Sequence, residues 1–346
     1  GQTSDGCDIE LITIENIHGN KVELLSFGAI IYGIKLNMPD GKLRDIVLGY
    51  DSVAEYENDD AHLGSTIGRC ANRIGPFDET KKPGFELNGV KYYLAENSAK
   101  SVHLHGGCKG FDRKVFEYET DNNSVTFTCV SYDGEENYPG NITFKVKFTF
   151  DDNNCLLVKY TAVSDKDTVC NFTNHSYFNL DGHASGSEKA LAHKLQINSE
   201  GFTEVDDIMI PTGKIIQVKD TPFDFRTPCV VGDRINSRCR DMEVCGGYDH
   251  NYVTGEMGVM KEVAVLESDD GKVRMCVSSD MPCLQLYTAN FLSDIKGKAN
   301  ALYGYRSAVC LETQNYPDAV NKPMFASPVL KAGEVFVSES VYLFQI

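Results

Sequence analysis

The 346-residue sequence lacks the features that mark several common functional classes. It has no apolar run long enough to cross a bilayer, and its N-terminus lacks the basic and then apolar pattern of a signal peptide. No glycine-rich phosphate loop follows a strand-like segment, so no nucleotide-binding motif is found. We therefore expect neither a membrane nor a nucleotide as partner.

Positive charge is scarce. The chain has 33 lysine and arginine residues against 50 aspartate and glutamate residues, which gives a formal net charge of −17. A nucleic-acid-binding protein gains most of its affinity by neutralising phosphates, and this charge would repel them. The acidic balance is compatible with small neutral or cationic ligands, or serves solubility alone.

The cysteines lack the spacing of a metal or redox pair. No two of the 12 are separated by two residues, and their scatter suits buried thiols in a reducing compartment. Glycosylation sequons begin at Asn171 and Asn174, and the second contains His175, a candidate catalytic residue. A glycan there would block the site, so we expect a cytoplasmic protein.

What the sequence does have is alternation of apolar and polar residues. This alternation predicts a strand with one buried and one exposed face over residues 142–150, where the apolar positions are Ile142, Phe144, Val146, Phe148 and Phe150. A second follows the turn-forming residues 151–154, with Leu156, Val158, Tyr160 and Ala162, so the two should form a hairpin. Similar runs contain Val125, Phe127 and Cys129, and Ile30, Tyr32, Ile34 and Leu36. Asp40-Gly41 and Asn88-Gly89 are expected to be tight turns.

Helical patterns are few and short. Ser52 could cap a brief helix through Ala54 and Tyr56, and little else has a helical period. There is no linker, repeat or low-complexity segment. We therefore expect a single domain, residues 1–346, with an all-β fold built as a large antiparallel β-sandwich with few short helices.

Five segments combine charged or imidazole side chains with glycine or asparagine, namely residues 68–74, 103–107, 174–180, 247–251 and 311–319. Each has a structural alternative. Arg73 could be an ion-pair partner, and Asp249 and His250 could cap a turn. Glu312 is the hardest to explain in this way, because an acid among apolar neighbours is costly to bury.

Taken in order, these segments resemble the signature of the aldose 1-epimerase (galactose mutarotase) family. Further matching strings lie at residues 45–51, 210–213, 221–226, 284–288 and 341–344, so the resemblance covers nearly the full chain. One matching string would be weak evidence for this family, whereas many matching strings in the same order are specific to it. The fold of this family is a large antiparallel β-sandwich, in agreement with the alternation.

The resemblance implies an enzyme that interconverts the α and β anomers of free aldoses such as galactose and glucose. It implies that Glu312 is the general base and His175 the general acid. The residues that would hold the sugar hydroxyls and ring oxygen are Asn72, Arg73, His105, Asp249 and Gln285. His103 and His250 lie beside matched residues and have no assigned role.

The sequence departs from the family pattern in places. Phe116 stands where tryptophan is usual, and the chain contains no tryptophan at all. Asn137 replaces a usual glycine, and Ser338 stands where histidine is common. None of these is a proposed proton carrier, so the departures bear on loop details and sugar preference.

The chemistry requires a carboxylate and an imidazolium on one sugar, to take a proton from the C1 hydroxyl and deliver one to the ring oxygen. We therefore expect Glu312 to be ionised and His175 protonated when sugar binds, with Arg73 helping to keep Glu312 ionised. No metal or other cofactor is needed. The expected partner is a free aldohexose, and the expected assembly is a monomer or homodimer.

Three other functions compete. A retaining glycosidase could use Glu312 with Asp249 as its two carboxylates, but His175 would then have no role. A carbohydrate-binding β-sandwich would need no paired acid and base. A metal hydrolase is disfavoured because no pair of histidines has helical ligand spacing.

Overall fold

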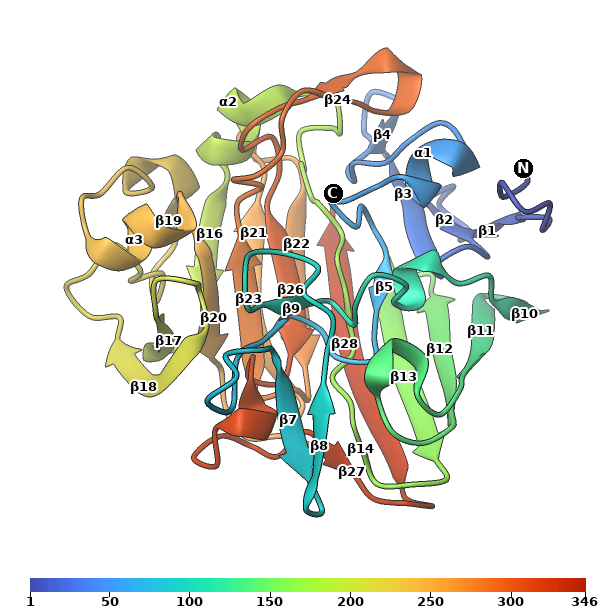
Figure 1. The fold of residues 1–346 in the computed structure, drawn as a ribbon. Coiled ribbons are helices and arrows are strands. Elements are labelled where there is room, and N and C mark those ends of the chain that lie inside the picture. The colour runs from blue at the N-terminus through green and yellow to red at the C-terminus, as the bar shows by residue number, and fades with distance from the viewer.

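The computed structural model describes the whole chain from Gly1 to Ile346 and consists mainly of antiparallel strands (Figure 1). The largest sheet has nine strands in the order β10-β11-β12-β13-β28-β22-β21-β16-β19. Their bounds are β10 (Glu117–Asp121), β11 (Ser124–Ser131), β12 (Ile142–Phe150), β13 (Cys155–Ser164), β28 (Val335–Gln345), β22 (Arg274–Ser279), β21 (Lys261–Glu267), β16 (Lys194–Ile197) and β19 (Cys229–Val230).

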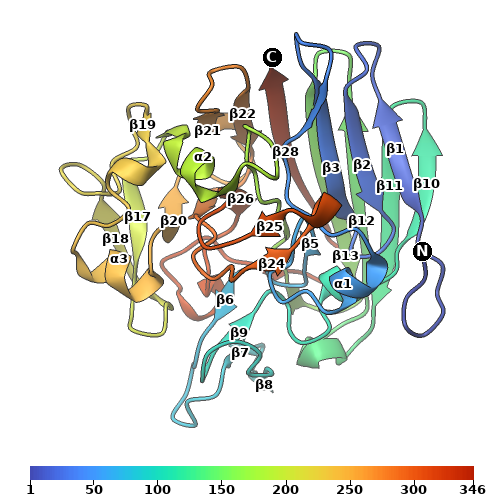
Figure 2. The same cartoon turned by 90° about the horizontal axis from the view of Figure 1, so that it is seen from above.

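Two smaller sheets form the second layer of the sandwich (Figure 2). One is four-stranded, with β1 (Leu11–Glu15), β2 (Lys21–Leu25), β3 (Ile30–Asn37) and β4 (Leu43–Asp45) in sequential order. The other is five-stranded, in the order β18 (Pro211–Gln217), β17 (Gly201–Val205), β20 (Asp249–Val253), β23 (Cys283–Tyr287) and β26 (Cys310–Gln314). The all-β sandwich expected from the alternation is therefore confirmed.

Short pairs of strands connect the layers and extend from them. They are β5 (Thr66–Ile67) with β15 (Thr173–Asn174), β6 (Arg73–Ile74) with β9 (His103–Leu104), β7 (Gly84–Leu87) with β8 (Val90–Tyr93), β14 (Thr168–Val169) with β27 (Val329–Leu330), and β24 (Ile295–Lys296) with β25 (Leu302–Tyr303).

Helices are few, as expected. The α-helices are α1 (Val53–Glu57), α2 (Gly186–Ala192) and α3 (Arg240–Cys245), and the 3₁₀ turns are η1 (Phe111–Arg113), η2 (Glu135–Asn137), η3 (Val231–Asp233), η4 (Lys298–Asn300) and η5 (Ala319–Asn321). Ser52 caps α1 in a capping box with Glu55, as predicted, whereas α2 and α3 were not expected. None of these helices has the length and apolarity required to traverse a bilayer.

The predicted hairpin is present, because β12 pairs with β13 over its full length, from Ile142↔Ser164 to Phe150↔Leu156. The β3 strand differs from its predicted alternation. A register shift between Glu23 and Leu24 of β2 leaves Tyr32 as an extra residue on β3. Ile31 therefore joins Ile34 in the main core, and Tyr32 packs against a second cluster.

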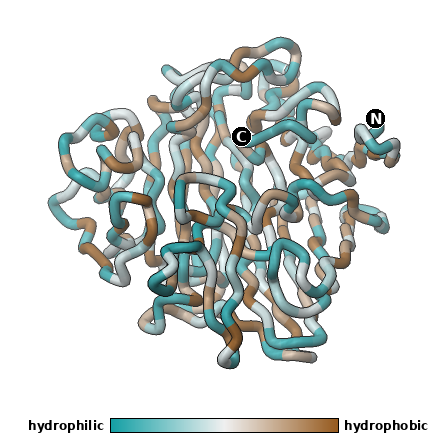
Figure 3. The backbone as a smooth tube through the Cα atoms, in the orientation of Figure 1, coloured by the Kyte–Doolittle hydropathy of each residue, from teal (hydrophilic) through white to brown (hydrophobic).

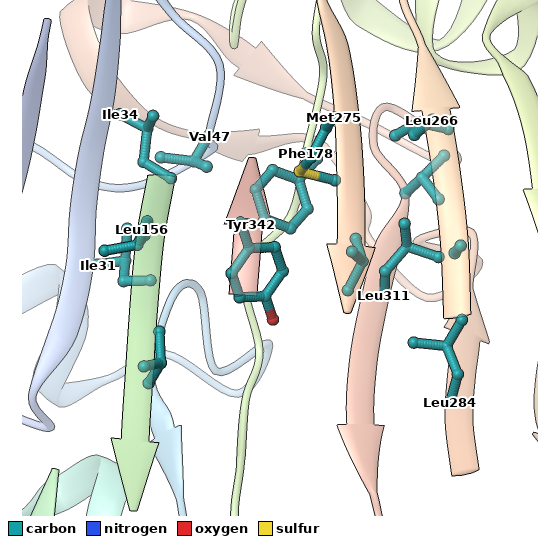
Figure 4. Close-up of a cluster of buried hydrophobic side chains, with 14 of the residues drawn as sticks. Ile31, Ile34, Val47, Leu156, Phe178, Leu266, Met275, Leu284, Leu311 and Tyr342 are labelled. Carbon is teal, nitrogen blue, oxygen red and sulfur yellow. The ribbon is translucent and has the colours of Figure 1, made fainter. Parts of the chain in front are cut away.

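Apolar side chains from all three sheets meet in one core. Figure 4 shows Ile31 and Ile34 of β3 near Leu156 of β13, and Leu284 and Leu311 of the five-stranded sheet on the side of Met275 and Leu266. Figure 3 shows apolar positions recurring along these strands, while hydrophilic positions are frequent in the outer loops. The core fixes the five-stranded sheet, and two of its polar residues, Asp249 of β20 and Glu312 of β26, line a cavity outside the core.

Candidate active site

A cavity of about 380 Å³ lies where β20, β23 and β26 meet the loops that follow α1, β9 and β15. Its wall includes Asn72, Arg73, His105, His175, Asp249 and Glu312, six of the seven residues predicted to act on substrate. These residues are far apart in the sequence. The antiparallel pairing of β20, β23 and β26 places Asp249 opposite Tyr287, and Gln285 opposite Glu312.

Glu312 lies in the middle of β26 and is buried. Its Oε2 has no hydrogen-bond partner in the protein, and its Oε1 lies 3.8 Å from Nε2 of His175. Burial raises the pKa of Glu312 well above the usual carboxyl value, Asp249 raises it further, and Arg73 lowers it. A buried carboxyl with an unpartnered oxygen at a cavity wall is positioned to bind a polar ligand.

His175 follows β15 and is fixed by its backbone, whose N–H donates to Ser65 and whose carbonyl accepts from Gly64. Its ring stacks on Tyr177, with centroids 4.9 Å apart. Burial lowers the pKa of His175 to about 3, and the nearby His62 lowers it as well. Nδ1 has no partner, so neither ring nitrogen is engaged in a strong hydrogen bond within the protein.

Arg73 and Asp249 form a buried ion pair on the cavity wall. Nη2 of Arg73 lies 2.9 Å from Oδ2 of Asp249, and Nε2 of Gln285 donates to the other oxygen, Oδ1, at 2.5 Å. Asp249 therefore has both oxygens fixed. Gln285, the seventh predicted residue, does not line the cavity, and the structure places it behind Asp249.

Asn72 and His105 face each other from the β6 and β9 segments. Both have left-handed backbone conformations, with φ of 63° and 52°, and the backbone N–H of Asn72 donates to Nδ1 of His105 at 3.2 Å. Burial lowers the pKa of His105 well below its usual value. The next residue, Gly106, could not carry a side chain, because a Cβ would lie 2.0 Å from the carbonyl oxygen of Gly68.

The two histidines without an assigned role are structural. His103 is bonded to the carbonyl of Ala95 and to the hydroxyl of Tyr138, each at 2.9 Å. His250 packs against Phe202 and Phe223, and its Nδ1 accepts from the backbone of Asp249. Neither lines the cavity.

Sequence reasoning missed several residues of the wall. Tyr177 and Tyr287 lie beside His175, and Phe291 lies near the mouth with 62% of its surface exposed. His62, in the loop after α1, also lines the cavity. The residues Tyr177 and Tyr287 fall inside matched strings, whereas His62 lies outside them, so the sequence offered no signal for it. The structure contains no cluster of histidine, cysteine or acidic side chains arranged to hold a metal ion.

Comparisons with known proteins agree on one family. The family profile described as aldose 1-epimerase matches residues 10–343. The chain is 38% identical to galactose mutarotase from Bos taurus, and the match covers 94% of this chain and 91% of that protein. It is 33% identical to aldose 1-epimerase from Escherichia coli (strain K12), and that match covers 98% of this chain and 96% of that protein. Among solved structures, an aldose epimerase homologue from C. elegans has a TM-score of 0.88 at 29% identity, covering 98% of this chain and 99% of that one. The galactose 1-epimerase from Lactobacillus acidophilus NCFM has a TM-score of 0.84 at 28% identity, covering 100% and 97%.

Proposed function

The chain belongs to the aldose 1-epimerase family, and from this premise we propose that its cavity interconverts the α and β anomers of a free aldohexose, with Glu312 as base and His175 as acid. The observation that carries the proposal is the pair itself. Two buried groups that can exchange protons lie 3.8 Å apart, each with an unpartnered polar atom, on the wall of a cavity. Such a pair suits acid–base chemistry on a small polar substrate.

The reaction opens and recloses the sugar ring. Glu312 removes the proton from the C1 hydroxyl while His175 delivers a proton to the ring oxygen, so the C1–O5 bond breaks and C1 becomes an aldehyde. Rotation about C1–C2 presents the other face of the carbonyl. The reverse transfers then return the proton to C1–O and close the ring with the opposite configuration, so no proton or electron is consumed.

The surroundings of Glu312 and His175 favour a protonation state other than the expected ion pair. Burial favours the neutral form of both groups, because it raises the pKa of Glu312 and lowers that of His175. A protonated Glu312 beside a neutral His175 nevertheless carries the same number of protons as an ionised Glu312 beside a protonated His175. The two forms differ only by transfer across the pair, and we propose that the sugar hydroxyls stabilise the ionised one.

This coupling predicts a broad pH profile. The active pair holds one proton in total, so kcat/KM should fall in acid as His175 takes a second proton, near pH 3, and in alkali as the proton is lost. A glutamate and a histidine with their ordinary pKa values would instead give a narrow activity optimum between about pH 4.3 and pH 6.5. Rates measured from pH 3 to 10, corrected for spontaneous mutarotation, would contradict the coupling if they showed that narrow optimum.

The other wall residues are proposed to bind the sugar. Arg73, Asn72 and His105 offer donors and acceptors, and Asp249 offers a carboxylate already fixed by Arg73. Gln285 is proposed to help sugar binding by orienting Asp249, because it donates a hydrogen bond to Oδ1 of Asp249 while Arg73 pairs with Oδ2. All of these side chains are buried or nearly so, and a hydrogen bond in a buried site is electrostatically stronger than the same hydrogen bond in water.

Replacing Arg73 with alanine should weaken binding and turnover together, lowering kcat/KM by about 10- to 100-fold. The guanidinium is expected to touch the sugar in both ground and transition states, and its loss also leaves Asp249 buried without its ion-pair partner. Arg73→Lys is the matched variant, since it keeps the charge and loses the planar fork. If KM alone rises in both variants, the contact of Arg73 with the sugar is equally strong in the ground and transition states and does not contribute to kcat.

The proposal is tested by polarimetry on freshly dissolved α-D-galactose and α-D-glucose. Rotation should change faster with the enzyme than without it, and exhaustive chelation should leave the rate unchanged. Aryl glycosides should not be cleaved, because a blocked C1 hydroxyl has no proton to give up. Enzyme-dependent release of the aryl alcohol would favour a glycosidase, and sugar binding without any change in rate would favour a non-catalytic binding module.

We also propose that the chain is a single domain that acts in the cytoplasm as a monomer or homodimer. Support for a single domain comes from the main core, which draws side chains from Ile14 to Phe344. Support for the compartment comes from the two sequons. Asn171 and Asn174 are 1% and 2% exposed, and their amides bond to backbone carbonyls, so neither is accessible to a glycan.

A further inference from the structure

A third imidazole lies beside the two predicted histidines of the cavity. The ring centroid of His62 is 4.9 Å from that of His105 and 6.2 Å from that of His175, and His105 and His175 are 5.2 Å apart. His62 lies in the loop after α1 with φ of 57°, a left-handed conformation that histidine tolerates better than most residues. Its side chain is 14% exposed and lines the cavity.

Asp112 fixes the orientation of this ring. Oδ2 of Asp112, on η1, lies 3.0 Å from Nδ1 of His62 and 3.1 Å from Nε of Arg113. A carboxylate accepts, so Nδ1 of His62 carries a proton and Nε2 remains available. No hydrogen bond within the protein involves Nε2.

The surroundings favour a protonated ring. Burial lowers the pKa of His62, but the hydrogen bond and charge of Asp112, with a further contribution from Asp59, outweigh it and raise the pKa, while Arg113 opposes them. The neighbouring imidazoles of His105 and His175 are held neutral by burial. His62 is thus the one of the three imidazoles whose surroundings favour the charged form, in which Nε2 carries a proton.

We propose that His62, oriented by Asp112, is a further substrate-binding residue whose Nε2–H donates a hydrogen bond to a hydroxyl oxygen of the bound sugar. The proposal rests on the proposed function of the cavity and extends it. A charged donor in a partly buried site gives a stronger hydrogen bond than a neutral one, so this contact would help to select sugars with an oxygen at the matching position.

The first test separates sugar binding from anchoring of the loop. His62→Asn suits the left-handed backbone and can still reach Asp112 from near the Nδ1 position, but it has no group at the Nε2 position. His62→Gln places an amide near Nε2 instead. We expect His62→Asn to lower kcat/KM by about 10- to 100-fold, chiefly through KM, and His62→Gln to recover part of the loss. His183→Asn is the control, because His183 bonds to Tyr303 and does not line the cavity.

The second test uses monodeoxy galactoses. With the wild-type protein, loss of the hydroxyl that contacts His62 should lower kcat/KM, and in His62→Asn the same loss should have little further effect. Thermal unfolding of each variant checks that the fold is retained. Wild-type kcat/KM in His62→Asn for every sugar would overturn the proposal and leave His62 as a loop anchor. Absence of mutarotation by the wild-type protein would instead contradict the proposed function, and direct calorimetric binding of galactose to both proteins would still test the His62 contact.

Discussion

Replacing Glu312 with glutamine is expected to lower kcat for mutarotation by about 10²–10⁴-fold while sugar still binds. The amide keeps the shape of the side chain and loses the basic oxygen. Because burial raises the pKa of Glu312, the folded protein must take up a proton there at neutral pH, and removing the ionisable group relieves that cost. The free energy of unfolding at neutral pH should therefore stay the same or rise, as is common when a buried functional group is replaced.

The measurement is the decay of optical rotation, with unfolding by denaturant recorded in parallel. Glu23→Gln on β2 is the control, since Glu23 is also a buried carboxyl on a strand and does not line the cavity, although it is paired with Lys35, whose Nζ lies 2.8 Å from each carboxylate oxygen. It should keep full activity. Near-normal mutarotation by Glu312→Gln would rule out Glu312 as the base.

The second large effect is expected at the acid. His175→Asn should lower kcat by about 10²–10⁴-fold with little change in KM, because the proton reaches the ring oxygen only in the transition state. The asparagine cannot reach the position of Nε2, the atom that lies 3.8 Å from Glu312. The contact between the rings of His62 and His105 remains, so the local aromatic packing is only partly lost.

Added imidazole provides a further readout for this residue. His175→Ala would leave space on the cavity wall, and rescue by imidazole would show that a proton carrier, not a packing contact, had been lost. His183→Asn should be fully active and insensitive to imidazole. If His175→Asn keeps most of its activity, another group is the acid, and His105 is the next candidate, because it lies in the same cavity.

The fold could be predicted from the sequence to the level of its strands. Alternation located the strands of the β12–β13 hairpin, because side chains on a half-buried strand must alternate. The dipeptides Asp40-Gly41 and Asn88-Gly89 located two of the turns. Alternation failed at β3, where the extra residue Tyr32 changes the face of every residue that follows. Alternation also says nothing about which strands pair, so the position of β28 between β13 and β22 could not be foreseen.

The site could be predicted where local sequence carries its own signal. Glu312 was conspicuous as an acid on an apolar strand, and the structure places it on the cavity wall. His62 carried no such signal, because its role depends on Asp112, 50 residues away in the sequence. Contact of Gln285 with the sugar stays a prediction, and the hydrogen bond that its side chain donates to Asp249 could not be foreseen from the sequence.

The position of β28 has a consequence for biosynthesis. This strand, residues 335–345, pairs with both β13 and β22 and so joins the two halves of the nine-stranded sheet. A nascent chain on the ribosome therefore cannot complete the sheet until residues 335–345 have emerged, and until then β13 and β22 each present an unpaired edge. Premature termination before Val335 should yield a polypeptide that depends on chaperones and is rapidly degraded, even though every residue placed in the cavity has already been translated.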